Sequence, residues 1–206
     1  MPLLAEALDR LEQGFRALPA IGDAPPATPD RLASVLDEVA TRLQDNYPYF
    51  HPLYAGQMLK PPHPVARLAY ALALWINPNN HALDGGRASS AMELEAVAEM
   101  ARMLGWPQHL GHLTGGGTMA NLEALWVAGQ LRPGAAVVAS SQAHYTHSRI
   151  SAVLGLPFQS VGADEHGRMD LGRLEEVLAQ EEVGTVVATV GTTGLGAVDP
   201  LPALLA

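Results

Sequence analysis

The sequence predicts an α/β fold with a mostly parallel sheet covered by helices, preceded by a helical amino-terminal segment. Apolar residues recur at helical spacing in the first part of the chain, whereas apolar stretches without polar alternation begin only beyond residue 108. Helical patterns separate these later stretches, and this alternation is typical of parallel strands that are buried on both faces. The 206 residues, 48% of them hydrophobic, are enough to bury a sizeable core.

Two amphipathic helices and an irregular arm are predicted for residues 1–64. The first apolar stripe ends before Pro19 and consists of Leu4, Leu8, Leu11, Phe15 and Leu18. The second follows Thr28 at the N-cap and Pro29 at the first helical position, and it consists of Leu32, Val35, Leu36, Val39 and Leu43. Prolines exclude a regular helix or central strand from 47–64, so this segment is expected to be an ordered loop or a docking arm.

Two further helices are expected before the sheet begins. The first runs from Pro64 to Ile76 and carries a continuous apolar run. Ser90 and Glu93 have the spacing of a capping box and are expected to start the second, which Gly105 ends.

The rest of the chain is predicted to alternate strands with helices. Strands are expected over 109–114, 135–141, 157–161 and 185–191, and helices over 118–129, 147–154 and 170–180. Asp170 is expected to cap the last of these helices.

A triple glycine, Gly115-Gly116-Gly117, joins the first predicted strand to a helix that starts near Thr118. Glycines let backbone N–H groups turn toward a ligand, and a helix start adds unpaired donors and a positive dipole end, so a phosphate is the natural occupant. The spacing fits neither the Walker loop nor the dinucleotide motif. A tight connection that binds nothing is the alternative, and the motif by itself leaves both open.

Polar clusters also follow two other predicted strands. His144 and His147 come after 135–141, and Thr192 and Thr193 come after 185–191. Ligands collect at the carboxyl ends of strands in open α/β sheets. The histidines alone could bind a metal or form loop hydrogen bonds, but their segment has no carboxylate or thiol to complete a metal site. Taken together, the clusters favour a phosphorylated cofactor and no metal.

The charge balance limits the partners. Twenty-one acidic and twelve basic residues give a formal charge of −9, which disfavours nucleic acids and anionic membranes. The longest apolar run, Leu68–Ile76, is half of what a membrane-spanning helix needs. The absence of cysteine excludes disulfides and thiolate sites, and it fits a cytoplasmic location.

Five segments occur in a familiar order: HPLYAGQM, SSAMELE, TGGGTMANLEAL, SSQAHYTHSRISAVLG and ATVGTTGLGAVDP. In this order and spacing they resemble the pyridoxal-phosphate-dependent group II amino-acid decarboxylases, which include aromatic amino acid, glutamate and tyrosine decarboxylases. The resemblance runs from about His51 to the last residue. It implies the fold-type I pyridoxal-phosphate-dependent transferase fold, a cytoplasmic homodimer, and a role in amino-acid metabolism.

The resemblance also implies a division of the chain and of its site. Residues 1–64 would be the helical segment with the dimerisation and substrate arm, and 65–206 the first part of the large cofactor-binding domain. In that arm, Gln57 and Met58 would reach the substrate pocket of the partner subunit.

The cofactor residues follow from the same resemblance. Gly117 and Thr118 would hold the cofactor phosphate, and Asn121, in the following helix turn, would belong to the same site. His144 would stack on the pyridine ring as a catalytic residue, and Thr193 would line the cofactor.

The chain departs from the family where the cofactor-binding lysine should be. The family places that lysine far beyond the GTT motif, whereas the single lysine here, Lys60, lies upstream of the triple glycine and is expected at a solvated or pocket-rim position. Asp199 is expected to cap a following helix. By resemblance, the strand at 109–114 pairs with a strand beyond this sequence, whereas the other three strands are adjacent. The chain therefore resembles an amino-terminal half with an incomplete sheet, inactive without a carboxyl-terminal complement.

The predicted function is the decarboxylation of an L-amino acid to its amine, with aromatic amino acids, glutamate and aspartate all open as substrates. Two alternatives remain. One is another fold-type I pyridoxal-phosphate enzyme, similar to a desulfurase or an aminotransferase. The other is a non-catalytic homologue that binds a phosphorylated ligand or a partner chain.

Overall fold

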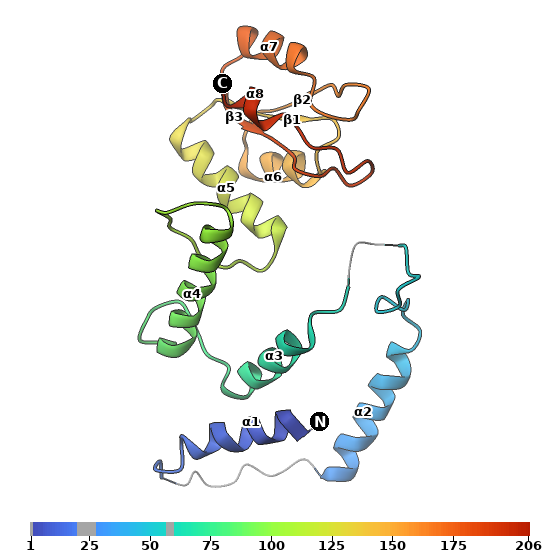
Figure 1. Ribbon diagram of the computed structural model, residues 1–206, viewed down its shortest axis with the longest axis vertical. Coiled ribbons are helices and arrows are strands. Elements are labelled where there is room, and N and C mark those ends of the chain that lie inside the picture. Colours follow the sequence, from blue (N-terminus) through green and yellow to red (C-terminus); the bar gives the residue numbers. More distant parts are fainter. Residues whose placement is uncertain (1, 20–27, 57–59) are drawn as a thin grey trace. The chain divides into compact units, whose positions relative to one another are not determined.

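The computed structural model describes residues 2–19, 28–56 and 60–206. The chain divides into two compact units, Met1–Glu95 and Ala96–Ala206 (Figure 1), and each is described by itself. The predicted boundary at residue 64 concerns a dimerisation arm and stays a prediction.

The first unit is helical. It contains α1 (Pro2–Gln13), α2 (Pro29–Leu43), α3 (Pro64–Ile76) and the beginning of α4 (Arg87–Met103). The bounds predicted for α3 are confirmed, and Thr28 is the N-cap residue of α2, although its side chain makes no capping hydrogen bond. Helix α1 ends before the predicted Leu18, because from Gly14 onward the backbone N–H groups bond to the third preceding carbonyl in a series of turns.

The predicted start of α4 is wrong. The helix begins at Arg87, and the Ser90 N–H bonds to the Gly86 carbonyl (2.7 Å), so no capping box forms. Glu93 is engaged elsewhere, because its carboxylate accepts a hydrogen bond from the side-chain amide of Asn80 (3.1 Å). The Ser89 hydroxyl donates to the side-chain oxygen of Asn80 (2.5 Å), so the Asn80 side chain connects the loop before α4 to the first turns of the helix.

The second unit contains a three-stranded parallel sheet in the order β2-β1-β3. Its strands are β1 (Ala136–Ser140), β2 (Phe158–Val161) and β3 (Val183–Val187), and its helices are α5 (Gly117–Leu131), α6 (Thr146–Leu154), α7 (Leu171–Gln180) and α8 (Leu201–Leu204). The predicted adjacency of the three later strands is confirmed. Asp170 caps α7 as predicted, because its carboxylate accepts the Arg173 N–H (3.1 Å).

Helices cover both faces of this sheet, as predicted (Figure 1). Successive residues of a strand point to opposite faces, and the central strand shows this clearly. Val138 packs with Met169 and Leu174 in one core cluster, on the side of α7. Val137 packs with Leu125 and Ile150 in the other, on the side of α5 and α6.

The strand predicted over 109–114 is not present. These residues have no regular secondary structure, and Leu110 is fully exposed. A strand needs a neighbour to bond with, and the three strands of the second unit pair only with one another. The last strand also ends earlier than predicted, at Val187, because beyond it Val190 forms an antiparallel bridge with Val198.

Within the described ranges, no helix is both long and apolar enough to cross a membrane.

Candidate functional site

The glycine loop before α5 is open. Gly116 is the N-cap residue and has φ 134°, a conformation that residues with a side chain rarely adopt. A Cβ atom added at Gly115, Gly116 or Gly117 would meet nothing within 4 Å. The Thr114 hydroxyl donates to the Gly116 carbonyl (3.0 Å) and so braces the turn.

The start of α5 supplies backbone donors to this open space. The Ala120 N–H forms the hydrogen bond to the Gly116 carbonyl (3.1 Å). The N–H groups of residues 117–119 precede it in the first turn, where no intrahelical acceptor is available. Such donors, together with the dipole of a fifteen-residue helix, fit a phosphate group, and Thr118 adds an exposed hydroxyl.

The topology brings the predicted site segments to one edge of the sheet. His144 follows β1 and Thr193 follows β3; these strands are parallel neighbours, so both residues lie at the carboxyl edge. Only residues 132–135 join the end of α5 to the start of β1, so α5 begins on the side of the carboxyl edge. Asn121 lies one turn into α5 and is half-buried. Gln57 and Met58 lie outside the described residues.

The two histidines after β1 have different surroundings. His144 is exposed at the edge, whereas His147 is half-buried on α6, and its Nδ1 atom has no hydrogen-bond partner within the described part of the chain. Burial, and secondarily the nearby His144, lowers the pKa of His147 from its ordinary value of 6.5. Of the two, His144 is therefore the accessible ring.

The loop after β3 is built on Thr192, which is 4% exposed. Its hydroxyl accepts the Ala197 N–H (3.0 Å), its own N–H donates to the Ala197 carbonyl (2.9 Å), and its carbonyl accepts the Gly196 N–H (2.8 Å). Thr193 follows at the exposed tip. The residue pattern did not separate the two threonines, and only the resemblance singled out Thr193; in the structure Thr192 holds the loop and Thr193 is exposed to solvent.

Asp199 has a role that the sequence reasoning missed. It does not cap α8, whose N-cap residue is Pro200. Its side chain is 1% exposed and accepts the N–H groups of Met169 and Thr189, each at 2.7 Å. It thus ties the turn after β2 to the chain that leads from β3 into the Thr193 loop. The sequence signal was an acidic residue between apolar neighbours, since a buried carboxylate must be paired.

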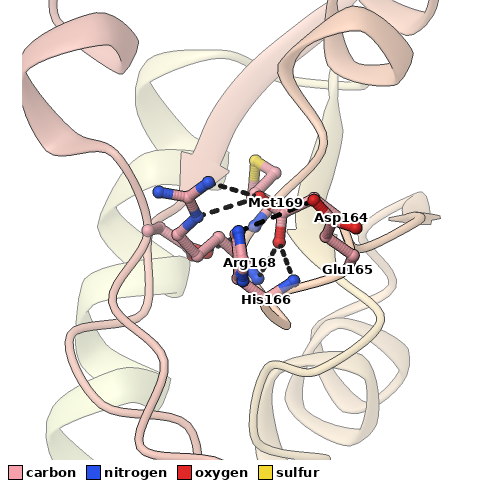
Figure 2. Close-up of polar contacts among 6 residues, drawn as sticks. Asp164, Glu165, His166, Arg168 and Met169 are labelled. Carbon is pink, nitrogen blue, oxygen red and sulfur yellow. Dashed lines mark hydrogen bonds and ion pairs between the residues drawn. The ribbon is translucent and has the colours of Figure 1, made fainter.

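A second aspartate organises the turn that precedes Met169. One carboxylate oxygen of Asp164 accepts the N–H groups of His166 and Arg168 (2.9 Å each), and the other accepts the Arg168 guanidinium (2.8 Å), as Figure 2 shows. These donors, the Arg168 N–H first among them, hold the pKa of Asp164 below its usual range. Asp164 therefore shapes the turn that Asp199 anchors.

The described residues contain no group of three or more histidine and acidic side chains placed to bind a metal ion. Lys60 is exposed in the first unit; its ammonium donates to the Tyr54 carbonyl (3.2 Å) and lies 5.4 Å from the centre of the Tyr54 ring.

Comparison with known proteins gives a consistent set of relatives, although no family profile matches. The chain is 29% identical to a probable L-aspartate decarboxylase of Archaeoglobus fulgidus over 81% of its own length and 45% of that protein. It is 31% identical to the L-2,4-diaminobutyrate decarboxylase of Rhizobium meliloti over 92% and 41%. An L-tyrosine decarboxylase of Enterococcus faecium is 40% identical over 54% of the chain and 20% of that enzyme.

Solved structures agree on the fold. Mouse CSAD in its apo form has a TM-score of 0.76 and 26% identity, over 95% of this chain and 44% of that one. Oryza sativa TDC, solved with PLP and tryptamine, has a TM-score of 0.77 at 22% identity over 95% and 45%, which supports the fold alone. The chain thus spans less than half the length of the two decarboxylases that it matches over most of its own length and of these two solved structures.

Proposed function

We propose that this chain, which is related to the pyridoxal-phosphate-dependent amino-acid decarboxylases, is the amino-terminal part of an enzyme that decarboxylates an L-amino acid to its amine. The observation that supports this most directly is the open glycine loop at the start of α5, on the same side of the sheet as His144 and Thr193. A phosphate-bearing ring would extend from that loop along the edge where the two side chains lie.

The residues of this chain would bind and orient the cofactor. The backbone N–H groups of Gly117 and Thr118 would hold its phosphate without a cation, Asn121 would lie one turn behind, His144 would stack on its ring, and Thr193 would line it. When bound, pyridoxal phosphate supplies an electron sink for the electron pair that stays on the α-carbon when the carboxylate leaves as carbon dioxide.

The arrangement of the whole protein is also part of the proposal. The lysine that binds the cofactor would come from a carboxyl-terminal complement, because the resemblance places it beyond the GTT motif, whereas Lys60, the single lysine of this sequence, lies upstream of the glycine loop. Residues 1–64 would form a homodimer contact, with Gln57 and Met58 in the partner's substrate pocket, and 65–206 would begin the large domain. We propose a cytoplasmic location.

The decisive experiment uses the full-length protein with a panel of L-amino acids that includes aspartate, tyrosine, glutamate and 2,4-diaminobutyrate. We expect carbon dioxide and the matching amine from at least one of them. His144→Ala should lower this activity much more than its matched control, His147→Ala. Equal losses would contradict the stacking role of His144.

The 206-residue chain by itself gives a second test. We expect it to release no carbon dioxide and to form no borohydride-reducible lysine adduct with pyridoxal phosphate. Turnover that Lys60→Ala abolishes would overturn the proposal. A full-length protein that binds the cofactor without any turnover would instead favour the non-catalytic alternative.

A further inference from the structure

The imidazole of His144 is held at one edge by Thr146. The Thr146 backbone N–H donates to the Nδ1 atom of His144 (3.3 Å), and the Thr146 hydroxyl contacts the same atom. Thr146 is itself 5% exposed at the first position of α6, so its side chain is fixed by the helix start. Both contacts therefore join an exposed edge residue to a buried one.

These contacts restrict where the ring carries its proton. A backbone N–H can only donate, so Nδ1 must accept, and the neutral ring then has its proton on Nε2. The Thr146 hydroxyl can rotate to donate to the same lone pair. His144 thus presents an N–H donor on the side of the ring away from Thr146.

One face of the ring is also covered. The Tyr145 ring lies with its centre 4.3 Å from that of His144, and the two ring planes are tilted by 30° to one another. The Arg149 guanidinium lies 4.3 Å from the centre of the Tyr145 ring and adds a cation–π contact. With one face against Tyr145, the opposite face of His144 is left for a ligand.

We propose that Thr146 is a positioning residue: through Nδ1 it fixes the orientation and tautomer of His144, so that one ring face is left for a bound ring and the Nε2–H group points away from Thr146 in the plane of the imidazole. The identity of that ring as pyridoxal phosphate rests on the proposed function. The contacts that position His144 do not depend on the proposed function, since all of them lie within residues 144–149.

The test is nitrogen NMR of the cofactor-free, full-length protein labelled with ¹⁵N-histidine, with His144→Gln to assign the signal. In the unaltered protein, Nδ1 of His144 should resonate as an unprotonated, hydrogen-bonded nitrogen. Thr146→Val removes the hydroxyl and keeps the backbone N–H, so the signal should move part of the way toward that of a free Nδ1, whereas Thr146→Ser should retain the original position. Ser151→Ala is the matched control, because Ser151 is a buried hydroxyl on α6 without a hydrogen-bond partner in the described residues.

Two results would overturn the proposal. The first is a protonated Nδ1 of His144 in the unaltered protein, a measurement that does not depend on the folding of any variant. The second is an Nδ1 signal in Thr146→Val at the same position as in the unaltered protein. A second measurement links the hold to binding. Loss of one such hydrogen bond should weaken pyridoxal phosphate binding by about fivefold in Thr146→Val, with recovery in Thr146→Ser. If the NMR result is as expected but neither the unaltered protein nor any variant binds pyridoxal phosphate, the proposed function fails and the positioning role of Thr146 stands.

Discussion

The two units differ in how many of their apolar residues they bury in regular elements. In the first, helices α1, α2 and α3 contain no buried residue among those described, although the sequence predicts apolar stripes for the first two helices and an apolar run for the third; Leu36, for example, is 66% exposed. In the second, all five residues of β1 are buried. Periodicity therefore predicts where a helix forms, but it does not tell whether the same chain covers its apolar face.

This difference bears on the proposed dimer. An exposed stripe of leucine and valine along α2 leaves a large apolar area in contact with water, and such areas mark interaction surfaces. The second unit closes its own core through two clusters on the faces of one sheet. We therefore expect stability to depend on single residues of the second unit and on association in the first.

The largest effect is expected at Asp199. Replacement by alanine leaves the N–H groups of Met169 and Thr189 without their acceptor in a buried site, and we expect a loss of about 3–5 kcal/mol in the free energy of unfolding. Urea denaturation monitored by circular dichroism measures this. Asp164→Ala is the matched control, since that carboxylate also accepts two backbone N–H groups but is solvent-accessible, so its loss should be clearly smaller. Equal losses would mean that burial is not what distinguishes the two aspartates.

The next effect compares one valine from each unit. Val138→Ala removes two methyl groups from a fully buried position and should cost about 2–3 kcal/mol. Val35 of α2 is 51% exposed, so Val35→Ala should change the unfolding free energy of the monomer very little. The same Val35 change should weaken self-association, measured by analytical ultracentrifugation. A dimer that Val35→Ala and Leu36→Ala leave unaffected would contradict a role of α2 in the contact.

The elements that the sequence predicted correctly are those with local causes. Pro64 to Ile76 forms a helix because the proline, the apolar run and the following asparagine all act within a few residues. Asp170 caps α7 for the same reason. The three later strands follow from their apolar composition and the helices between them, whereas their adjacency is what the resemblance implied. The roles of Gly117, Thr118, Asn121, His144 and Thr193 stay predictions that rest on resemblance.

What the sequence could not predict depends on distant partners. Glu93 has the spacing of a capping box, but its carboxylate accepts a hydrogen bond from the Asn80 side chain instead. Residues 109–114 have a strand-like composition, yet without a neighbouring strand they remain irregular. Asp199 lies beside a helix start and resembles a cap, but its acceptors face N–H groups that are 10 and 30 residues away. No local pattern shows such pairings.

A smaller effect compares two helix N-caps. Asp170→Ala removes the acceptor of the Arg173 N–H and should cost about 1 kcal/mol, measured by thermal or urea denaturation. Thr28→Ala, at the N-cap of α2, should cost less, because the Thr28 side chain makes no capping hydrogen bond. If Thr28→Ala lowers the unfolding free energy as much as Asp170→Ala does, then the Thr28 side chain caps α2 in solution and the two helix starts do not differ.

The smallest effect concerns the half-buried His147 and acid pH. Burial and His144 lower its pKa in the folded state, whereas the unfolded chain keeps the ordinary value of 6.5. Below that value the unfolded state binds more protons than the folded state, so stability from this group is fully present above pH 6.5 and is lost as the pH falls below it. His147→Phe should flatten this part of the curve of unfolding free energy against pH. If the curve of the variant falls as steeply as the original, the acid sensitivity belongs to another group. The burial of His147 would then not affect the stability of the second unit at acid pH.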